Sequence, residues 1–585
     1  MKNTKRIALF AVINFALLLG SCQETDTPIT SSSQSSSSSS SSASSSTGGS
    51  SSSFKADLTN DDLPKGATEF VDAEGKTEKL TRSRLYQNEG LPHVNSYPTS
   101  GKKQKLLVAP IKFTKDTTDS NDTIDANDAL LDKIRITFTG TKEETDAVGG
   151  NISVQEFYSQ SSFGKGAFDV VTIPTWIDFG MTAKKYQEST STAGITAADK
   201  VRSWYLAEYN KENHGALGED AYSLDDLDSD DDGFIDLIWN VYAYPYAQND
   251  TSFWWAYVTY TGNAAGNLKT PTVQTLAWAS TNFMSEGANG YESRTFIHET
   301  GHTLGLDDYY DYNKQWSPCG GIDYMDQNVG DHNSYSKFAC GWVNPWILKE
   351  EDLKGGKVAE ITLNDASRTG DCLILASPNY NNTAFDEYLM VELVGPYGLC
   401  KSDYTNKYGF TVPGIRVWHI DARAMTTDYA KEEVFSTPDE VGQKAYDVRN
   451  DNSKFGRGKN GDYWTVEKGN VKRSYAQITI LEAGYTDGDN TQTSATKKAD
   501  NNSLFKKNGT FALAGTEGAK DRAKVFMPSQ TNLWNKAKVI TNGNKTNQKY
   551  KVDQTMTINY KMQVRNIVQN VNGDGATATL RISLI

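Results

Sequence analysis

The stretch FIHETGHTLGLDDYYD, residues 296–311, contains two of the six histidines of the chain. About 0.05 His pairs with this spacing are expected by chance in a chain of this length and histidine content, so coincidence is a poor explanation. Residues four apart lie on one face of an α-helix, and a helix here directs the rings of His298 and His302 toward one point. Glu299 is offset by one position and can stand beside a bound ion without binding it. The spacing predicts a metal-binding helix with an acid–base residue next to the metal.

The residues after the second histidine supply a third ligand. Gly305 lies three residues beyond His302, where a residue with positive φ can end the helix and reverse the chain. Such a turn lets Asp308 approach the two histidines from the same short segment. Catalytic zinc typically takes three protein ligands and keeps a fourth position for water. The segment therefore predicts a zinc site formed by His298, His302 and Asp308.

Several other residues are candidates for the same site. His332 and His419 are alternative third ligands, and His332 could instead line the cleft or stabilise an oxyanion. His419 lies in a strand-like run, which is more typical of a hydrogen-bonded structural residue. The other candidates for the oxyanion contact are tyrosines close in sequence, namely Tyr309, Tyr310 and Tyr324.

A second candidate metal site lies in DLDSDDDGFID, residues 226–236. Gly233 matches the turn glycine of an EF-hand-like calcium loop, and the carbonyl of Phe234 matches its backbone ligand. The final bidentate Glu of such loops is replaced by Trp239, and the sequence continues as a strand, so we expect a calcium loop of another fold. A solvated acidic turn is the alternative. The expected calcium ligands are Asp228, Asp230, Asp232, Phe234 and Asp236.

The beginning of the chain has the pattern of an export signal. Three basic residues precede an apolar run, residues 7–20, which is too short to span a bilayer. The run ends in LGSC, which resembles the lipobox of bacterial lipoproteins and predicts a signal peptide at residues 1–21 and lipidation of Cys22. We expect an exported protein that lipid holds at the outer face of a bacterial membrane, or that is released outside the cell.

Composition divides the next part of the chain into two segments. Residues 22–53 are mainly serine, which predicts a flexible tether beginning at Cys22. Residues 54–100 are polar and turn-rich, and are interpreted as an N-terminal extension or a prosegment. No cysteine lies between residues 23 and 318, which excludes a prosegment that silences zinc through a thiolate.

Charge and cysteine content limit the partners. The formal net charge of −14 argues against nucleic acid or an anionic membrane surface, so membrane contact is expected only through the lipid, and the chain is expected to be monomeric. Four cysteines follow Cys22, at positions 319, 340, 372 and 400. An oxidising location allows two disulfides in three pairings, and buried free thiols are the alternative.

The hydrophobic pattern changes near residue 345. Before it, strand-like runs such as residues 105–113 and 234–244 alternate with helical spacing such as residues 197–210. After it the helical spacing fades, and residues 556–564 and 578–584 alternate between apolar and polar around a Gly-Asp-Gly turn. The pattern predicts an α+β (α/β-like) domain at residues 101–345. An all-β, sandwich-like region follows at residues 346–585.

These motifs resemble known zinc proteases. The pattern H-E-x-x-H-x-x-G-x-x-D is similar to the metzincin signature, with Asp in place of the third His. Five stretches resemble, in order, the immune inhibitor A family of secreted bacterial zinc metalloproteases, over roughly residues 105–421. They are SVQEFYSQSSFG, DLDSDDDGFIDLIWNVYA, HETGHTLGLDDYYD, DYMDQNVGDHNSYSKFACGW and DEYLMVELV…VPGIRVWHID.

The resemblance implies a metzincin-type zinc endopeptidase domain that acts on protein or peptide substrates. Asp307 stands where family members often have Pro, and the G-x-x-D spacing selects Asp308 as the ligand. Two alternatives are a catalytically impaired binding lipoprotein on the same fold and a zinc hydrolase of substrates other than peptides. The implied site residues are the ligands His298, His302 and Asp308, the general base Glu299, and Met325 in a Met-turn beneath the zinc.

Overall fold

The computed structural model describes residues 103–422 with short gaps, residues 477–483, 498–512 and 559–585, and several short strands outside these ranges. The signal peptide, Cys22, the serine tether and most of the expected extension lie outside the described residues. No described helix combines the length and the apolar character needed to cross a membrane.

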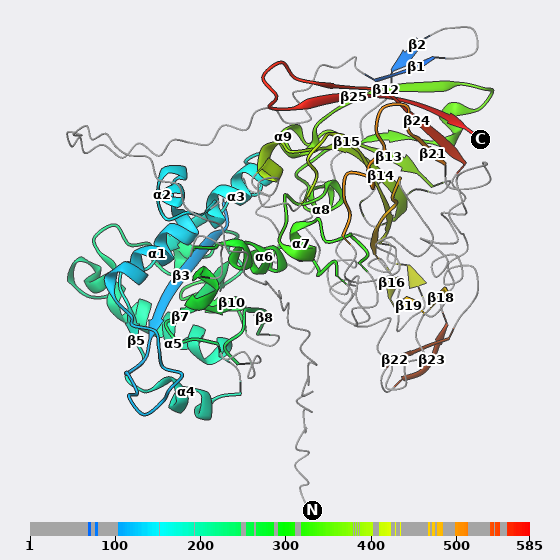
Figure 1. Ribbon diagram of the computed structural model, residues 1–585. Coiled ribbons are helices and arrows are strands. Elements are labelled where there is room, and N and C mark those ends of the chain that lie inside the picture. The colour runs from blue at the N-terminus through cyan, green and yellow to red at the C-terminus, as the bar shows by residue number, and fades with distance from the viewer. Residues whose placement is uncertain are drawn as a thin grey trace, which may run out of the picture.

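A mixed β-sheet with the order β4-β3-β7-β10-β8 forms the centre of the first part (Figure 1). β3 (Lys105–Lys112), β7 (Leu237–Tyr242) and β10 (Thr275–Ser280) are almost wholly buried and pair in parallel. β4 (Asp169–Thr172) pairs in parallel with β3, and β8 (Tyr257–Tyr260) runs antiparallel to β10 at the opposite edge. Strands covered on both faces read as continuous apolar runs, which is why the sequence revealed β3 and β7.

Helices cover both faces of this sheet, because alternate strand residues point to opposite sides. Trp239 of β7 belongs to the same core as Phe138 and Phe296, whereas its neighbour Ile238 packs in a second core with Val201. The first face is covered by α1 (Asp128–Thr139), α3 (Val154–Ser161) and α6 (Arg294–Thr303), and the second by α5 (Gly194–Tyr209). Other described elements are α2 (Lys142–Ala147), α4 (Ala183–Ser189), α7 (Tyr324–Gln327), α8 (Ser334–Ala339), α9 (Ala366–Thr369), β5 (Ile177–Asp178), β6 (Phe234–Ile235) and β9 (Thr272–Val273).

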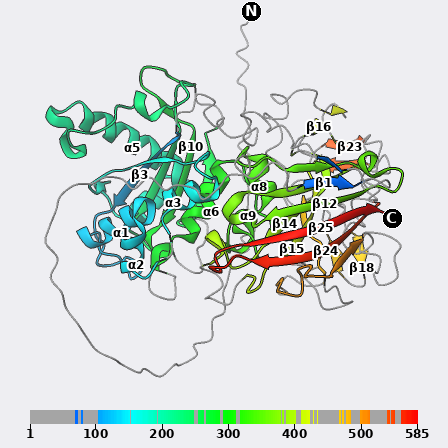
Figure 2. The same ribbon diagram turned by 90° about the horizontal axis from the view of Figure 1, so that it is seen from above.

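Two further sheets, of five and six strands, form the second part beside the first (Figure 2). The five-stranded sheet has the order β11 (Trp346–Leu348), β13 (Cys372–Ala376), β14 (Glu387–Val394), β15 (Gly414–Asp421) and β20 (Ile478–Ile480). The six-stranded sheet has the order β2 (Thr77–Lys79), β1 (Thr68–Val71), β12 (Val358–Asn364), β25 (Ala576–Leu584), β24 (Tyr560–Gln569) and β21 (Thr510–Ala512). Short hairpins are β16 (Thr427–Asp428) with β17 (Glu433–Val434), β18 (Val466–Lys468) with β19 (Val471–Arg473), and β22 (Val539–Asn542) with β23 (Lys545–Lys549).

The two sheets share one hydrophobic core. Leu389 of β14 belongs to it together with Ile361 of β12 and Leu580 of β25. The predicted C-terminal hairpin is confirmed from residue 560 on, because β24 and β25 pair antiparallel and their apolar positions face this core, whereas residues 556–558 of the prediction lie outside the described residues. β1, from the expected N-terminal extension, pairs with β12 and so belongs to this part of the molecule. Mixed α/β structure followed by packed β-sheets is therefore the observed architecture.

The five-stranded sheet is buried on its other face as well. Met390 and Trp418 on that face belong to the core that also contains Met325 of α7 and Phe338 of α8. α7 and α8 thus lie between the mixed sheet and the C-terminal sheets (Figure 1). The four described cysteines form none of the three allowed disulfide pairings, and Cys319, Cys340 and Cys372 are buried in this same core.

Candidate metal centre

The metal helix ends in the turn that its sequence predicts. α6 stops at Thr303, and Gly305 adopts a φ of 81°, a left-handed conformation that favours glycine. The N–H of Gly305 donates to the carbonyl of His302 at 2.9 Å, and the N–H of Leu306 donates to Gly301 at 3.2 Å. These bonds close the helix and direct the following residues back along it.

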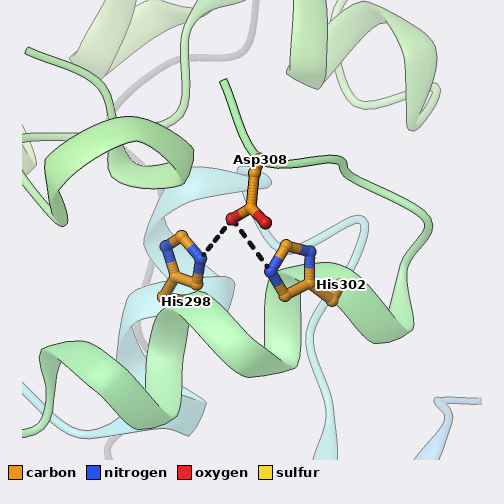
Figure 3. Close-up of side chains that lie close together, drawn as sticks. All are labelled: His298, His302 and Asp308. Atoms are coloured by element: carbon orange, nitrogen blue, oxygen red, sulfur yellow. Dashed lines mark hydrogen bonds and ion pairs between the residues drawn. The ribbon is translucent and has the colours of Figure 1, made fainter. Parts of the chain in front are cut away.

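The turn brings Asp308 to the two histidines (Figure 3). Oδ1 of Asp308 lies 3.1 Å from Nε2 of His298 and 3.3 Å from Nε2 of His302. One ligand atom from each residue lies within 4.8 Å of the others. His298 and Asp308 are buried, and His302 is partly exposed. Two imidazole nitrogens and a carboxylate oxygen that converge in this way form a donor set that suits zinc.

Backbone carbonyls orient both rings. Nδ1 of His298 donates to the carbonyl of Tyr324 at 3.0 Å, and Nδ1 of His302 donates to the carbonyl of Leu306 at 2.7 Å. A carbonyl can only accept, so the proton of each neutral ring sits on Nδ1 and the lone pair of Nε2 faces the centre. The chain thus holds both histidines in the tautomer that binds a metal through Nε2.

The charges at the centre favour a cation. Burial lowers the pKa of His298, but the Asp308 carboxylate raises it to about 9. Burial raises the pKa of Asp308, but the two histidines bring it well below its ordinary value. Asp308 therefore stays ionised beside the two histidines, and a divalent cation that binds there takes the place of histidine protons.

Glu299 stands beside this centre without belonging to the ligand group. It is partly buried, and burial raises the pKa of its carboxyl group against the opposing effect of His302 and His298. A carboxylate with a raised pKa is suited to accept a proton. Burial and then the charge of Glu299 raise the pKa of Tyr257 in the edge strand β8 to about 12, although the ring of Tyr257 packs with Trp278 on the other face of the sheet.

Met325 packs directly against the metal helix. It is fully buried in α7, and its N–H donates to Oδ1 of Asp323, the N-cap residue, at 2.8 Å. A Cβ atom on Gly301 would lie 2.6 Å from the Met325 sulfur, so only glycine permits this approach at that position of α6. The Met325 carbonyl accepts the N–H of Tyr309 at 2.8 Å. The segment of Met325 therefore supports both the helix and the chain that carries Asp308.

The other candidates from the sequence do not join the ligand group. His332 is 3% exposed, is surrounded by aromatic rings, and neither of its nitrogens has a hydrogen-bond partner among the described residues. His419 is buried in β15, where its Nε2 lies 3.0 Å from Oε1 of Glu387. Both histidines thus lie in the protein core, because apolar or strand neighbours enclose them.

The neighbouring tyrosines and Asp307 are not part of the ligand group either. The Tyr309 hydroxyl hydrogen-bonds to Ser336 Oγ at 2.7 Å, and the ring of Tyr324 is buried 4.3 Å from that of Phe157. Tyr310 is partly exposed. Asp307 is buried outside the ligand group, where its charge acts on Tyr309.

The acidic loop forms a second cluster. One carboxylate oxygen each from Asp228, Asp230 and Asp236 lies within 4.8 Å of the others. Asp232 is not in this group, and its Oδ1 accepts the N–H of Phe234 at 2.9 Å. Burial and then the neighbouring acids raise the pKa of Asp230 to about 7, and burial raises that of Asp236 to about 6.

The backbone of this loop is closely held. Oδ2 of Asp236 accepts the N–H of Lys105 at 2.6 Å, which ties the loop to the first residue of β3. Asp228 accepts the N–H groups of Asp232 and Gly233 at 3.0 and 2.8 Å. Gly233 has a φ of 86°, and a Cβ there would lie 2.5 Å from Asn267 N, as expected for the glycine of a tight turn.

No family model and no curated protein matches the chain. Its function is therefore inferred from the site. Two histidines, a carboxylate and a neighbouring glutamate can hold a divalent cation and accept a proton beside it, which is the chemistry of metal-assisted hydrolysis.

Proposed function

We propose that the protein is an exported zinc endopeptidase of the metzincin type, related to the immune inhibitor A family and anchored through Cys22. The observation that carries this proposal is the convergence of His298, His302 and Asp308 around one point, with Glu299 adjacent on the same helix. The packing of Met325 beneath that helix supports the metzincin type, because a Met-turn in this place is part of the signature.

Each residue has a definite role in peptide hydrolysis. His298, His302 and Asp308 hold zinc, which when bound polarises the scissile carbonyl and lowers the pKa of water from about 15.7 to about 7. Glu299 accepts a proton from the attacking water and passes it to the leaving amine, a contribution of about 10²- to 10⁴-fold.

The edge of the mixed sheet favours a peptide over other substrates. β8 pairs with β10 on one side only, and no described strand pairs with its other edge. A free strand edge presents N–H and C=O groups that an extended peptide can satisfy by adding a strand. Val258 of β8 packs against the core that contains Phe296 and Ile297 of α6, so a peptide bound along this edge lies beside the helix that carries the proposed general base.

Cleavage of an unstructured protein by the full chain tests the proposal. Casein and a peptide library should be cleaved by zinc-loaded protein, and a chelator should abolish cleavage until zinc is restored. Mass spectrometry of the library products defines the sequence preference. A zinc-loaded protein that cleaves no peptide would contradict the proposal and favour the alternative of a catalytically impaired binding lipoprotein. Hydrolysis of esters or non-peptide amides alone would indicate a zinc hydrolase of other substrates.

We also propose that the acidic loop binds calcium and stabilises the first part of the chain. Asp228, Asp230 and Asp236 supply converging oxygens, which are the ligands that calcium prefers. Binding to the folded state alone stabilises by roughly 2.7 kcal/mol at a hundredfold excess over Kd. We expect the melting temperature of calcium-free, zinc-replete protein to rise by several degrees when calcium is added.

Variants of the loop separate binding from general charge effects. Asp230→Ala combined with Asp232→Ala should remove the calcium-dependent shift, since Asp230 belongs to the cluster. Asp225→Ala is the control, because Asp225 is an exposed acid outside the cluster and should leave the shift unchanged. A wild-type melting curve that does not respond to calcium would count against the site.

A further inference from the structure

A buried hydrogen-bond network holds the segment that orients His298. Asp323 is fully buried, and its Oδ1 accepts the N–H of Met325 at 2.8 Å. Its Oδ2 accepts the main-chain N–H of Asn333 at 3.0 Å and the side-chain amide of the same residue at 2.8 Å. Asn333 in turn accepts the N–H of Ser336 at 2.9 Å. The caps of α7 and α8 are therefore bonded to each other.

The C-terminal sheet continues this network. Glu392 of β14 and Arg416 of β15 are directly opposed in the strand pairing and form a buried ion pair with an N–O distance of 2.8 Å. The second carboxylate oxygen of Glu392 accepts the N–H and hydroxyl of Ser334, the residue after Asn333. NH1 of Arg416 donates to the carbonyl of Ile322 at 3.2 Å. The ion pair is thus hydrogen-bonded to the residue before Asp323, through Arg416, and to the residue after Asn333, through Glu392.

The network ends at a metal ligand. Tyr324 follows Asp323, and its carbonyl accepts Nδ1 of His298 at 3.0 Å. The position of this carbonyl decides where the Nε2 lone pair of His298 points, because the ring is planar and its two nitrogens are fixed relative to each other. A buried ion pair contributes little net stability, since desolvation offsets the attraction, and its best attested use is to specify one arrangement.

We propose that Asp323 is a positioning residue for His298, and that Asn333 and the Glu392–Arg416 pair extend this control to the C-terminal sheet. The two parts of the chain then form one metal-binding unit. This inference rests on the proposed zinc site but not on peptide cleavage. It differs from a purely structural role, which would lower stability without changing zinc affinity in the folded protein.

Asp323→Asn tests the inference in the full chain. The new amide keeps the size of the side chain, and its oxygen can still accept the Met325 N–H. Its NH₂ group, however, replaces the oxygen that accepts two N–H groups of Asn333, so donors then face donors. Losing a partner that orients a metal ligand typically weakens binding by about 10- to 100-fold. We expect a zinc Kd weakened by this factor in competition with a chromophoric chelator, and an altered visible spectrum of the cobalt-substituted protein.

Asp371→Asn is the matched control. Asp371 is also a buried carboxylate, and it accepts the N–H of Asn364 at 3.0 Å and Nε1 of Trp346 at 3.2 Å within the C-terminal part. This variant should keep the wild-type zinc affinity and cobalt spectrum even if it melts earlier. The double variant Asp323→Asn with Asn333→Asp restores a donor opposite an acceptor and should recover part of the lost affinity.

Arg416→Lys provides a second route if Asp323→Asn does not fold. Lysine keeps the charge but cannot donate to Glu392 and to the Ile322 carbonyl in the same geometry, so zinc binding should again weaken. Wild-type affinity and spectrum in a folded Asp323→Asn or Arg416→Lys protein would overturn the inference, as would equal losses in Asp371→Asn. Wild-type protein that binds zinc but cleaves no peptide contradicts the proposed function alone, and wild-type protein that binds no zinc contradicts both.

Discussion

Glu299→Gln is expected to reduce peptide cleavage by at least about 10²-fold while zinc stays near stoichiometric. The factor is the lower end of what a general base contributes. The substitution keeps the shape of the side chain and removes only its ability to accept the proton. Glu299 lies outside the group formed by His298, His302 and Asp308, so the ligands are untouched. Metal analysis beside a peptide-cleavage assay measures both quantities on one sample.

The melting curve is the control for this variant, since a folded protein is needed to interpret a loss of rate. Chelator-treated wild-type protein gives the baseline that the variant should approach. Peptide cleavage by Glu299→Gln at the wild-type rate would contradict the assignment of Glu299 as the general base. Loss of zinc together with activity would instead show that Glu299 is needed for metal binding.

Removing a proposed zinc ligand is expected to weaken zinc binding by more than roughly 100-fold, the upper end of the effect of losing a residue that only hydrogen-bonds to a ligand. His302→Ala leaves two of the three donors, and Asp308→Ala removes the oxygen that lies 3.1 and 3.3 Å from the two histidine nitrogens. Both variants should lose zinc on dialysis and lose cleavage with it, because catalytic zinc needs three protein ligands. Chelator competition measures the affinities.

Asp307→Ala is the matched control for Asp308→Ala. The two acids are adjacent and both buried, but only Asp308 reaches the histidines. We expect Asp307→Ala to keep its zinc even if its stability changes, because its charge acts on Tyr309 and Tyr335. Zinc bound at full strength by Asp308→Ala, or lost from Asp307→Ala alone, would overturn the ligand assignment.

The candidate metal centre could be predicted because His298, His302 and Asp308 lie within one short segment. Helix periodicity places His298 and His302 on one face, and Gly305 reverses the chain so that Asp308 returns to them. The acidic loop is local in the same way, although the structure places Asp232 outside the group of three carboxylates. Local geometry depends on backbone preferences that each residue carries with it, so these predictions needed no knowledge of the fold.

The strands that could be predicted are those whose hydrophobic pattern lies within one continuous stretch of sequence. Continuous apolar runs indicated β3 and β7, and alternation indicated the C-terminal hairpin of β24 and β25. The pairing of β1 with β12 joins residues that are far apart in the chain, and no local pattern indicated it. His332 illustrates the same limit, because its sequence neighbours gave no sign of the aromatic rings that enclose it.

The sequence by itself determined the grouping of His298, His302 and Asp308, with Glu299 beside them, because helix spacing and the turn at Gly305 lie within one short segment. Only the tertiary structure decided what stands around them, namely Met325 against Gly301 and the buried hydrogen bonds through Asp323. These contacts join strands and helices that are remote in sequence, and their energy arises only when burial excludes water from both partners. The donors of the site are therefore local, whereas their orientation is a property of the whole fold.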